Sequence, residues 1–210
     1  TNKASREMRH RLKKLLDPSS ALPLTSTFHA LCRKILADHI PPFAVIDDDD
    51  QALILKEALR RAGEIQGRIS DNVDDFLGRI LAAKQKLLEP TDDLSAVCRP
   101  FHPDLFQKVY GIYEVFLSHQ ALCDYEDLIF KTVKLMDDPG ICAIYRDRFE
   151  YVFVDEYQDL NHGQYRIIKS LCPSGKNLCV IGDPDQSIYG FRGSDPSYFN
   201  RFVDDFPGAV

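Results

Sequence analysis

The sequence lacks any long hydrophobic stretch and any recognisable leader. Its longest apolar runs are far shorter than the ~20 residues that a membrane-spanning helix needs. No charged segment followed by an apolar one opens the chain, so nothing in it indicates secretion. We therefore expect a cytoplasmic protein without a membrane partner.

The sequence also lacks the cysteine spacing of a metal site. Its 6 cysteines include no C-x-x-C pair, the spacing that is typical of a zinc site. A chain of 210 residues with 44% apolar residues can build a sizeable core, so it does not need a disulfide scaffold. We expect most of these cysteines to be buried thiols.

An excess of positive charge is missing as well. The formal net charge of -6 argues against a protein that coats nucleic acid indiscriminately. It does not exclude a local binding site, because binding follows the local potential. Residues 1–39 carry eight lysines or arginines against three acids, whereas residues 47–50 are all aspartate. The charge is therefore unevenly distributed, with its basic part at the start.

Hydrophobic periodicity and capping residues predict helices through the first two thirds of the chain. We expect a basic helix over residues 3–16, a possible short strand at 22–26, and a helix from a Thr27 cap to about Asp38. Asp48 or Asp49 can cap the next helix and Ser70 the one after it. The further predicted helices cover residues 48–62, 70–88, 103–122 and 125–136. In the third of these, one apolar stripe contains Leu105, Val109, Ile112 and Phe116.

The pattern changes after Pro139 and Gly140, where strands begin to alternate with helices. Apolar strands are predicted at 150–154 and 177–181, with a helix capped by Asn161 between them. A last helix begins near Asp195, where Pro196 suits the first turn. The sequence thus predicts an α/β fold with a parallel sheet, interrupted by an all-helical insert. We assign residues 1–42 and 123–210 to the sheet-containing domain and 43–122 to the insert.

The strongest chemical signal is an acidic pair at the end of a predicted strand. Asp155 follows the apolar run directly, and Glu156 comes next. Mg²⁺ prefers one or two carboxylates together with water and phosphate oxygens, so Asp155 is a candidate metal ligand. Glu156 could polarise an attacking water. Alternatively, both acids only mark a helix start, where they favour the helix dipole.

A second polar cluster follows the next predicted strand. Two parallel strands deliver their polar ends to the same edge of a sheet, where open α/β folds bind ligands. Gln186, in the loop after the second strand, could contact a terminal phosphate and a metal-bound water. Alternatively, it is a turn glutamine bonded to its own loop. The aromatic and guanidinium groups just beyond it could stack on unpaired bases, or pack over a core with the arginine in an ion pair; they are Tyr189, Phe191 and Arg192.

Two helix starts near the beginning of the chain are candidate seats for backbone phosphates. The free amides of a helix N-terminus attract anions. The first segment contains Thr1, Asn2 and Lys3, and the second contains Thr27, Phe28 and His29. Each could equally be an ordinary helix cap.

Taken together, these segments resemble the UvrD/Rep/PcrA group of superfamily-one DNA helicases. Residues 1–8 (TNKASREM) resemble motif Ia, 27–32 (TFHALC) motif Ib, 155–159 (DEYQD) motif II and 182–193 (GDPDQSIYGFRG) motif III. Residues 43–51 (FAVIDDDDQ) and 124–128 (DYEDL) also fit segments between these motifs. The match covers nearly the whole chain in the same order.

The resemblance implies an incomplete RecA-like P-loop NTPase core, motor domain 1A, with a helical domain 1B inserted in it. It implies Asp155 as the Mg²⁺ ligand, Glu156 as the base that orients water, and Gln186 as a γ-phosphate contact. It also implies that Tyr189, Phe191 and Arg192 link the ATP state to single-stranded DNA. The partners that it implies are single-stranded DNA and single/double-strand junctions. Phe191 stands where the family often has tryptophan, which has a larger stacking area and an indole donor.

One motif of the family is absent from this sequence. No G-x-x-x-x-G-K-[ST] occurs, and that loop normally cradles the β- and γ-phosphates. Because the usual order places it before Thr1, we interpret the sequence as part of a longer chain. A second motor domain with its arginine fingers would follow Val210. We expect the 210 residues alone to be inactive in ATP turnover and unwinding.

Two other interpretations stay open from the sequence. The chain could be a DNA-binding or protein-docking module whose motifs are relics. It could also be a metal-dependent nuclease with a two-metal cluster, which requires converging carboxylates; the candidates are Asp155, Glu156, Asp183 and Asp185.

Overall fold

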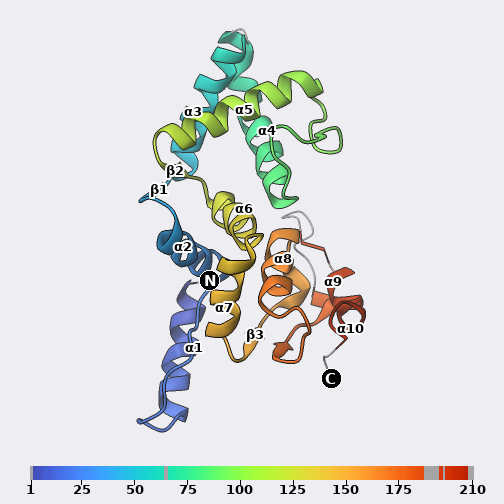
Figure 1. The fold of residues 1–210 in the computed structure, drawn as a ribbon. Coiled ribbons are helices and arrows are strands. Elements are labelled where there is room, and N and C mark those ends of the chain that lie inside the picture. Colours follow the sequence, from blue (N-terminus) through green and yellow to red (C-terminus); the bar gives the residue numbers. More distant parts are fainter. Residues whose placement is uncertain (1, 64–65, 187–193, 196, 208–210) are drawn as a thin grey trace.

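The computed structural model describes residues 2–63, 66–186, 194–195 and 197–207. They are mostly helical, with two small parallel sheets (Figure 1). The helices are α1 (Asn2–Leu15), α2 (Phe28–His39), α3 (Asp48–Ala62), α4 (Gln66–Gln85), α5 (Pro103–His119), α6 (Tyr125–Met136), α7 (Pro139–Arg148), α8 (His162–Leu171), α9 (Ser197–Asn200) and α10 (Phe202–Asp205). The strands are β1 (Ala44–Val45), β2 (Leu122–Cys123), β3 (Val152–Val154) and β4 (Leu178–Val180). Two 3-10 turns are η1 (Tyr157–Asp159) and η2 (Pro184–Gln186).

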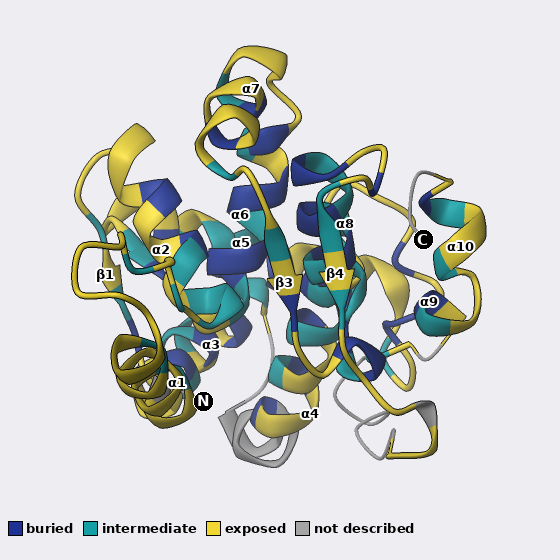
Figure 2. Ribbon diagram, turned by 90° about the horizontal axis from the view of Figure 1, so that it is seen from below, coloured by how far each residue is buried: buried dark blue, intermediate teal, exposed yellow. Residues whose placement is uncertain are grey.

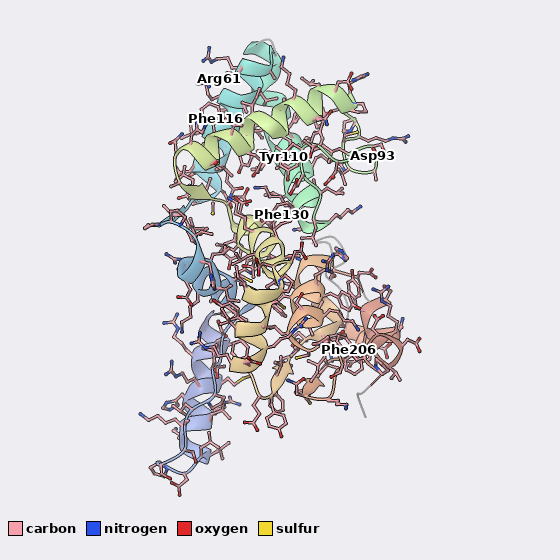
Figure 3. The ribbon with its side chains drawn as sticks, in the orientation of Figure 1. Arg61, Asp93, Tyr110, Phe116, Phe130 and Phe206 are labelled. Atoms are coloured by element: carbon pink, nitrogen blue, oxygen red, sulfur yellow. The ribbon has the colours of Figure 1, made fainter. Side chains whose placement is uncertain are left out.

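Helices α3, α4 and α5 form the upper group in Figure 1 and enclose an apolar core of their own. Asp47 caps α3 by accepting a hydrogen bond from the Asp50 amide at 3.0 Å. Tyr110 of α5, labelled in Figure 3, is buried in this core. On the outer surface the Arg61 guanidinium lies 4.4 Å from the centre of the Phe116 ring.

Helix α6 lies below that group and is the centre of a second apolar core. It packs against α2, α7 and α8, which contribute Ile35, Tyr145 and Ile167. Local capping defines these helices: Asp124 and Asp127 form a capping box at the start of α6, and Asn161 and Gln164 form another at α8. The chain passes between the upper core and this second core through β1 and β2, which pair in parallel.

Strands β3 and β4 pair in parallel, with Val152 opposite Leu178 and Val154 opposite Val180. Their inward residues pack on α8 and on a third core that includes Phe206. The outward face is apolar yet exposed, as the yellow segments of Figure 2 show. Its members are Tyr151, Phe153, Cys179 and Ile181, of which Phe153 is 72% exposed. Parallel sheets are normally covered on both faces, so this sheet has one face without a covering layer among the described residues.

Several sequence-based predictions are confirmed and others are corrected. Helix α6 has the predicted bounds, and five cysteines are buried free thiols, with Cys179 exposed. Residues 22–26 form no strand, because Pro23 lacks an amide for pairing. The cap of α3 is Asp47 rather than Asp48 or Asp49, and α4 starts before Ser70. Helix α7 was not predicted; it begins at Pro139, which suits a first helical turn.

The buried face of α5 also differs from the predicted stripe. Leu105, Ile112 and Phe116 are only partly buried, whereas the core face consists of Phe106, Val109, Tyr110, Tyr113 and Leu117. The helix turns Phe106, Tyr110 and Tyr113 to the core because aromatic side chains bury more surface than leucine or isoleucine does. Within the part of the chain that the structure describes, every helix is too short or too polar to cross a membrane.

Candidate functional site

The ends of β3 and β4 meet at one edge of their sheet and carry the predicted acidic residues. The Ile181 amide donates to the Val154 carbonyl at 2.8 Å, and the Tyr157 amide donates to the Ile181 carbonyl at 3.0 Å. These bonds extend the strand pairing past Val154, so the two polar loops leave the sheet side by side. Asp155 and Glu156 are both exposed at this edge.

Glu156 adopts a left-handed backbone conformation, with φ 55°. Such a conformation is uncommon for a residue with a side chain and clusters at functional sites. It turns the chain sharply from β3 into η1. The Asp155 carboxylate accepts the Glu156 amide at 3.1 Å, which helps to hold this turn.

Gln158 connects the two loops and was not assigned a role from the sequence. Its side chain is buried; Nε2 donates to Glu156 Oε2 at 2.6 Å, and Oε1 accepts the Asp183 amide at 3.1 Å. Asp183 in turn accepts from Gln186 Nε2 at 2.8 Å. A continuous chain of hydrogen bonds therefore runs from Glu156 to Gln186. The signal in the sequence that could have indicated this bridging role was a glutamine inside an acidic motif at the end of a strand.

Gly182 allows this close approach of the two loops. A Cβ atom built at Gly182 would lie 2.3 Å from Gln158 Oε1 and 3.1 Å from the Tyr157 amide nitrogen. Both distances are shorter than normal contacts, so any other residue here would push Gln158 out of its bridging position. Glycine is thus required at position 182 because the loop that carries Tyr157 and Gln158 leaves no room for a side chain.

We expect Gln158→Leu to lower the free energy of unfolding by about 1–3 kcal/mol, because it removes two hydrogen bonds of a buried side chain, to Glu156 and to the Asp183 amide, each worth about 0.5–1.5 kcal/mol. Leucine has a similar volume, so packing is largely kept. Urea unfolding of the two proteins measures the change. The exposed Gln107→Leu is the matched control and should stay within about 0.5 kcal/mol of the parent. Equal stability of both variants would contradict the bridging role.

The donor set at this edge suits a hard cation. Exposed carboxylates are the protein ligands that Mg²⁺ prefers, and Asp155 supplies one directly at the end of the strand. A two-metal nuclease needs more than this. Asp155, Glu156, Asp183 and Asp185 are all among the described residues, but no three of them bring ligand atoms within 4.8 Å of one another. The arrangement therefore does not favour the nuclease interpretation.

The predicted nucleic-acid residues fall in three groups. Lys3 is exposed on α1, and Asn2 lies in the same helix. Thr27 caps α2 by accepting the Ala30 amide at 3.3 Å, with Phe28 partly buried beneath it. The remaining residues, Thr1, Tyr189, Phe191 and Arg192, lie outside the described residues.

His29 stacks on Tyr125, the first residue of α6. The ring centres are 4.0 Å apart with an interplanar angle of 22°, and Tyr125 is 47% exposed. Burial lowers the pKa of His29 to about 4, because the charged ring is poorly solvated there. Tyr125 was missed from the sequence; an aromatic residue directly after a helix cap was the signal that could have found it.

Because its folded-state pKa lies below its ordinary value of 6.5, neutral His29 favours the fold above about pH 6.5. That contribution is lost as the pH falls towards 4. We expect His29→Phe, which keeps a stacking ring, to show a smaller drop in melting temperature between pH 7 and pH 4.5 than the parent. The exposed His119→Phe should show the parental drop. An unchanged drop in His29→Phe would argue against a buried neutral imidazole.

Residues 1–207 match the family described as UvrD/REP helicase N-terminal domain. The chain is 38% identical over 216 residues to the ATP-dependent DNA helicase PcrA of Staphylococcus aureus (strain Mu50 / ATCC 700699), covering 100% of this chain and 29% of that protein. It is 37% identical over 223 residues to PcrA of Staphylococcus epidermidis (strain ATCC 35984), with the same coverage. The chain thus spans less than a third of the length of these relatives, and it belongs to the UvrD/REP helicase N-terminal domain family.

Proposed function

We propose that the chain is part of an ATP-dependent DNA helicase that couples ATP hydrolysis to movement along single-stranded DNA and to unwinding at single/double-strand junctions. The observation that carries this proposal is the parallel pairing of β3 with β4. It brings Asp155 and Glu156 to the same edge as Gln186, with Gln158 and Asp183 connecting them. The matched relatives carry the name ATP-dependent DNA helicase, which supports the same conclusion.

Each residue at the edge has a distinct role in the proposed reaction. Asp155 would hold Mg²⁺, which when bound neutralises negative charge on the phosphate oxygens. Glu156 orients the attacking water and accepts its proton. Gln186 contacts the terminal phosphate of ATP. Because Gln158 bonds Glu156 and the Asp183 amide, loss of the phosphate at Gln186 is transmitted to the loop that holds the base.

The nucleic-acid surface consists of the starts of α1 and α2 and the loop that follows Gln186. Thr1, Asn2 and Lys3 hold one part of the phosphodiester backbone, and Thr27, Phe28 and His29 another. The side chains of Tyr189, Phe191 and Arg192 stack on bases and respond to the ATP state. Neutral His29 donates or accepts hydrogen bonds without adding charge at physiological pH.

The division into domains belongs to the proposal as well. Residues 43–122 form the inserted helical domain 1B, which the separate core of α3, α4 and α5 supports. Residues 1–42 and 123–210 form an incomplete RecA-like domain 1A. The exposed apolar face of β3 and β4 supports its incompleteness, because a RecA-like sheet is covered on both faces. Without the phosphate loop and the second motor domain, the 210 residues alone are inactive.

The test uses the full-length cytoplasmic protein that carries this chain. Its ATPase rate should rise on addition of single-stranded DNA. The logarithm of its association constant for single-stranded DNA should fall linearly with the logarithm of the salt concentration, with a slope of about −0.7 for each phosphate contact. Lys3→Ala should reduce this slope by about 0.7, whereas Lys56→Ala on α3 should leave it unchanged. An ATPase rate that does not change on addition of single-stranded DNA would overturn the proposal.

A further inference from the structure

A buried lysine lies at the boundary between the upper core and the core around α6. Lys84, in the last turn of α4, has a side chain with no exposed surface. Its Nζ lies 2.7 Å from Glu114 Oε1 and 2.8 Å from Asp127 Oδ1, and it also contacts Asp124. We refer to Lys84, Glu114, Asp124 and Asp127 as the Lys84 cluster.

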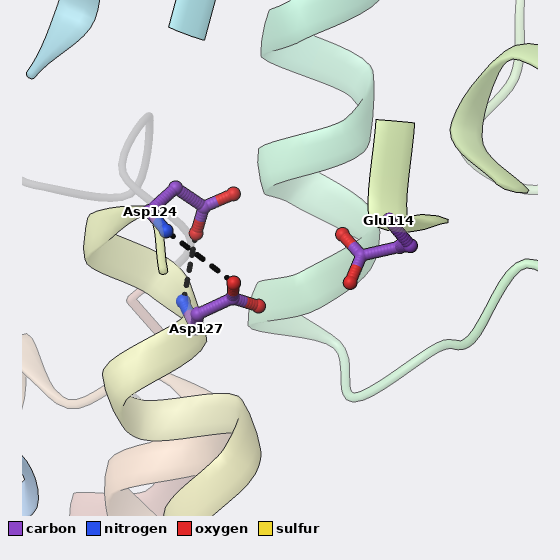
Figure 4. A group of neighbouring side chains, drawn as sticks. All are labelled: Glu114, Asp124 and Asp127. Carbon is purple, nitrogen blue, oxygen red and sulfur yellow. Dashed lines mark hydrogen bonds between the residues drawn. The ribbon is translucent and has the colours of Figure 1, made fainter. Parts of the chain in front are cut away.

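The acidic members of the cluster converge as cation ligands do. Figure 4 shows Glu114 reaching from α5 towards Asp124 and Asp127 at the start of α6. The ammonium group of Lys84 is the cation that these carboxylates surround. Its pKa is raised well above the ordinary lysine value: burial opposes the charge, but the carboxylates, Asp124 first, more than offset it. The site is therefore filled from within the chain.

The cluster joins parts of the molecule that have separate apolar cores. Lys84 and Glu114 belong to α4 and α5, whereas Asp124 caps α6 and Asp127 lies in its first turn. Tyr113 of α5 adds a second bond across the boundary, donating to Asp124 at 3.1 Å. Apolar packing tolerates small shifts, whereas a buried ammonium is stabilised only while its carboxylate partners on both sides of the boundary stay within hydrogen-bonding distance.

The same two carboxylates define the start of α6. Asp124 accepts the Asp127 amide at 2.8 Å, and the Asp124 amide donates to the Asp127 carboxylate at 3.3 Å. Lys84 therefore contacts both members of the capping box. The next residue, Tyr125, stacks on His29 at the start of α2. A displacement of α4 would thus be transmitted through one helical turn to His29.

We propose that the Lys84 cluster sets the orientation of α4 and α5 relative to α6, and that Lys84 is thereby a positioning residue for the nucleic-acid surface at the start of α2. The inference rests on the proposed function, because it concerns the DNA that His29 and Thr27 contact. Lys84 itself is enclosed and touches no DNA. Its effect is exerted through Asp124, Tyr125 and the stacked His29 ring.

The test breaks the contacts of Lys84 between α4, α5 and the start of α6 without changing the net charge of the cluster. Lys84→Met combined with Asp124→Asn removes one positive and one negative charge, and asparagine caps a helix as well as aspartate does. In the full-length protein we expect the DNA concentration for half-maximal ATPase to rise about tenfold, with kcat at saturating DNA within about twofold of the parent. Purely structural damage would instead lower kcat through loss of folded protein.

Lys131→Met is the matched control. Lys131 also contacts Asp127, at 3.1 Å, but both residues are on α6, so this pair does not cross the boundary. Its DNA concentration for half-maximal ATPase should equal that of the parent. If the double variant does not fold, Asp124→Asn alone takes its place. We expect this variant to raise the DNA concentration for half-maximal ATPase about threefold.

The two hypotheses fail in different ways. The positioning role alone would be overturned by one result: the parent ATPase responds to DNA, and the folded double variant has the same DNA concentration for half-maximal ATPase as the parent. A parent protein whose ATPase does not respond to DNA would overturn the proposed function and the positioning role together.

Discussion

Replacing Glu156 with glutamine in the full-length protein is expected to lower ATP turnover by roughly 10²–10⁴-fold, the usual contribution of a positioned general base. Glutamine has the same shape, and its side-chain oxygen can still accept the 2.6 Å hydrogen bond from Gln158. The loop should therefore keep its conformation while losing the group that accepts the proton. Steady-state ATPase measured at saturating single-stranded DNA gives the rate.

DNA affinity separates this effect from misfolding. Glu156→Gln should bind single-stranded DNA within about twofold of the parent, because no step of binding requires the carboxylate. Glu89→Gln is a matched control: Glu89 forms a surface ion pair with Lys134 at 2.8 Å, and its loss should leave turnover unchanged. Near-normal turnover in Glu156→Gln would remove Glu156 from the role of base.

The largest effect on stability is expected from Lys84→Met. Removing one partner of a buried ionic group leaves uncompensated charge, which costs about 3–5 kcal/mol of unfolding free energy. Here the remaining carboxylates of Glu114, Asp124 and Asp127 would face one another, with Lys131 as the remaining lysine paired to the cluster among the described residues. Urea unfolding at pH 7 measures the loss.

The loss should depend on pH in a defined direction. Burial already raises the pKa of Glu114 above its ordinary value, so ionising this group costs the folded state as the pH rises through that pKa. Without Lys84 this cost grows. The loss of unfolding free energy in Lys84→Met should therefore be larger at pH 8 than at pH 5. Adding Asp124→Asn should recover part of it.

A surface lysine provides the comparison for this prediction. Lys134 pairs with Glu89 at 2.8 Å, but both side chains are close to half exposed, at 45% and 44%. Exposed pairs contribute only about 0–1 kcal/mol, so Lys134→Met should be nearly neutral. A Lys84→Met protein as stable as Lys134→Met would show that the buried cluster contributes nothing to the fold.

Local signals in the sequence determined much of the helical structure. Thr27 and Asn161 cap the helices that they were predicted to cap, and α6 begins and ends where periodicity placed it. These signals suffice because a cap and an apolar stripe act within one or two turns of the same helix. The order of apolar strand and polar end likewise indicated the positions of β3 and β4.

Only the tertiary structure decided which of these elements meet. The partners of Lys84 are 30 to 43 residues away, and Asp183 lies 25 residues beyond Gln158. Nothing in a local pattern distinguishes a buried lysine at the end of a helix from a solvated one, or a bridging glutamine from a surface one. Such residues acquire their roles only when packing removes water from around them, because a polar group without water must then be satisfied by whatever partner the fold brings near.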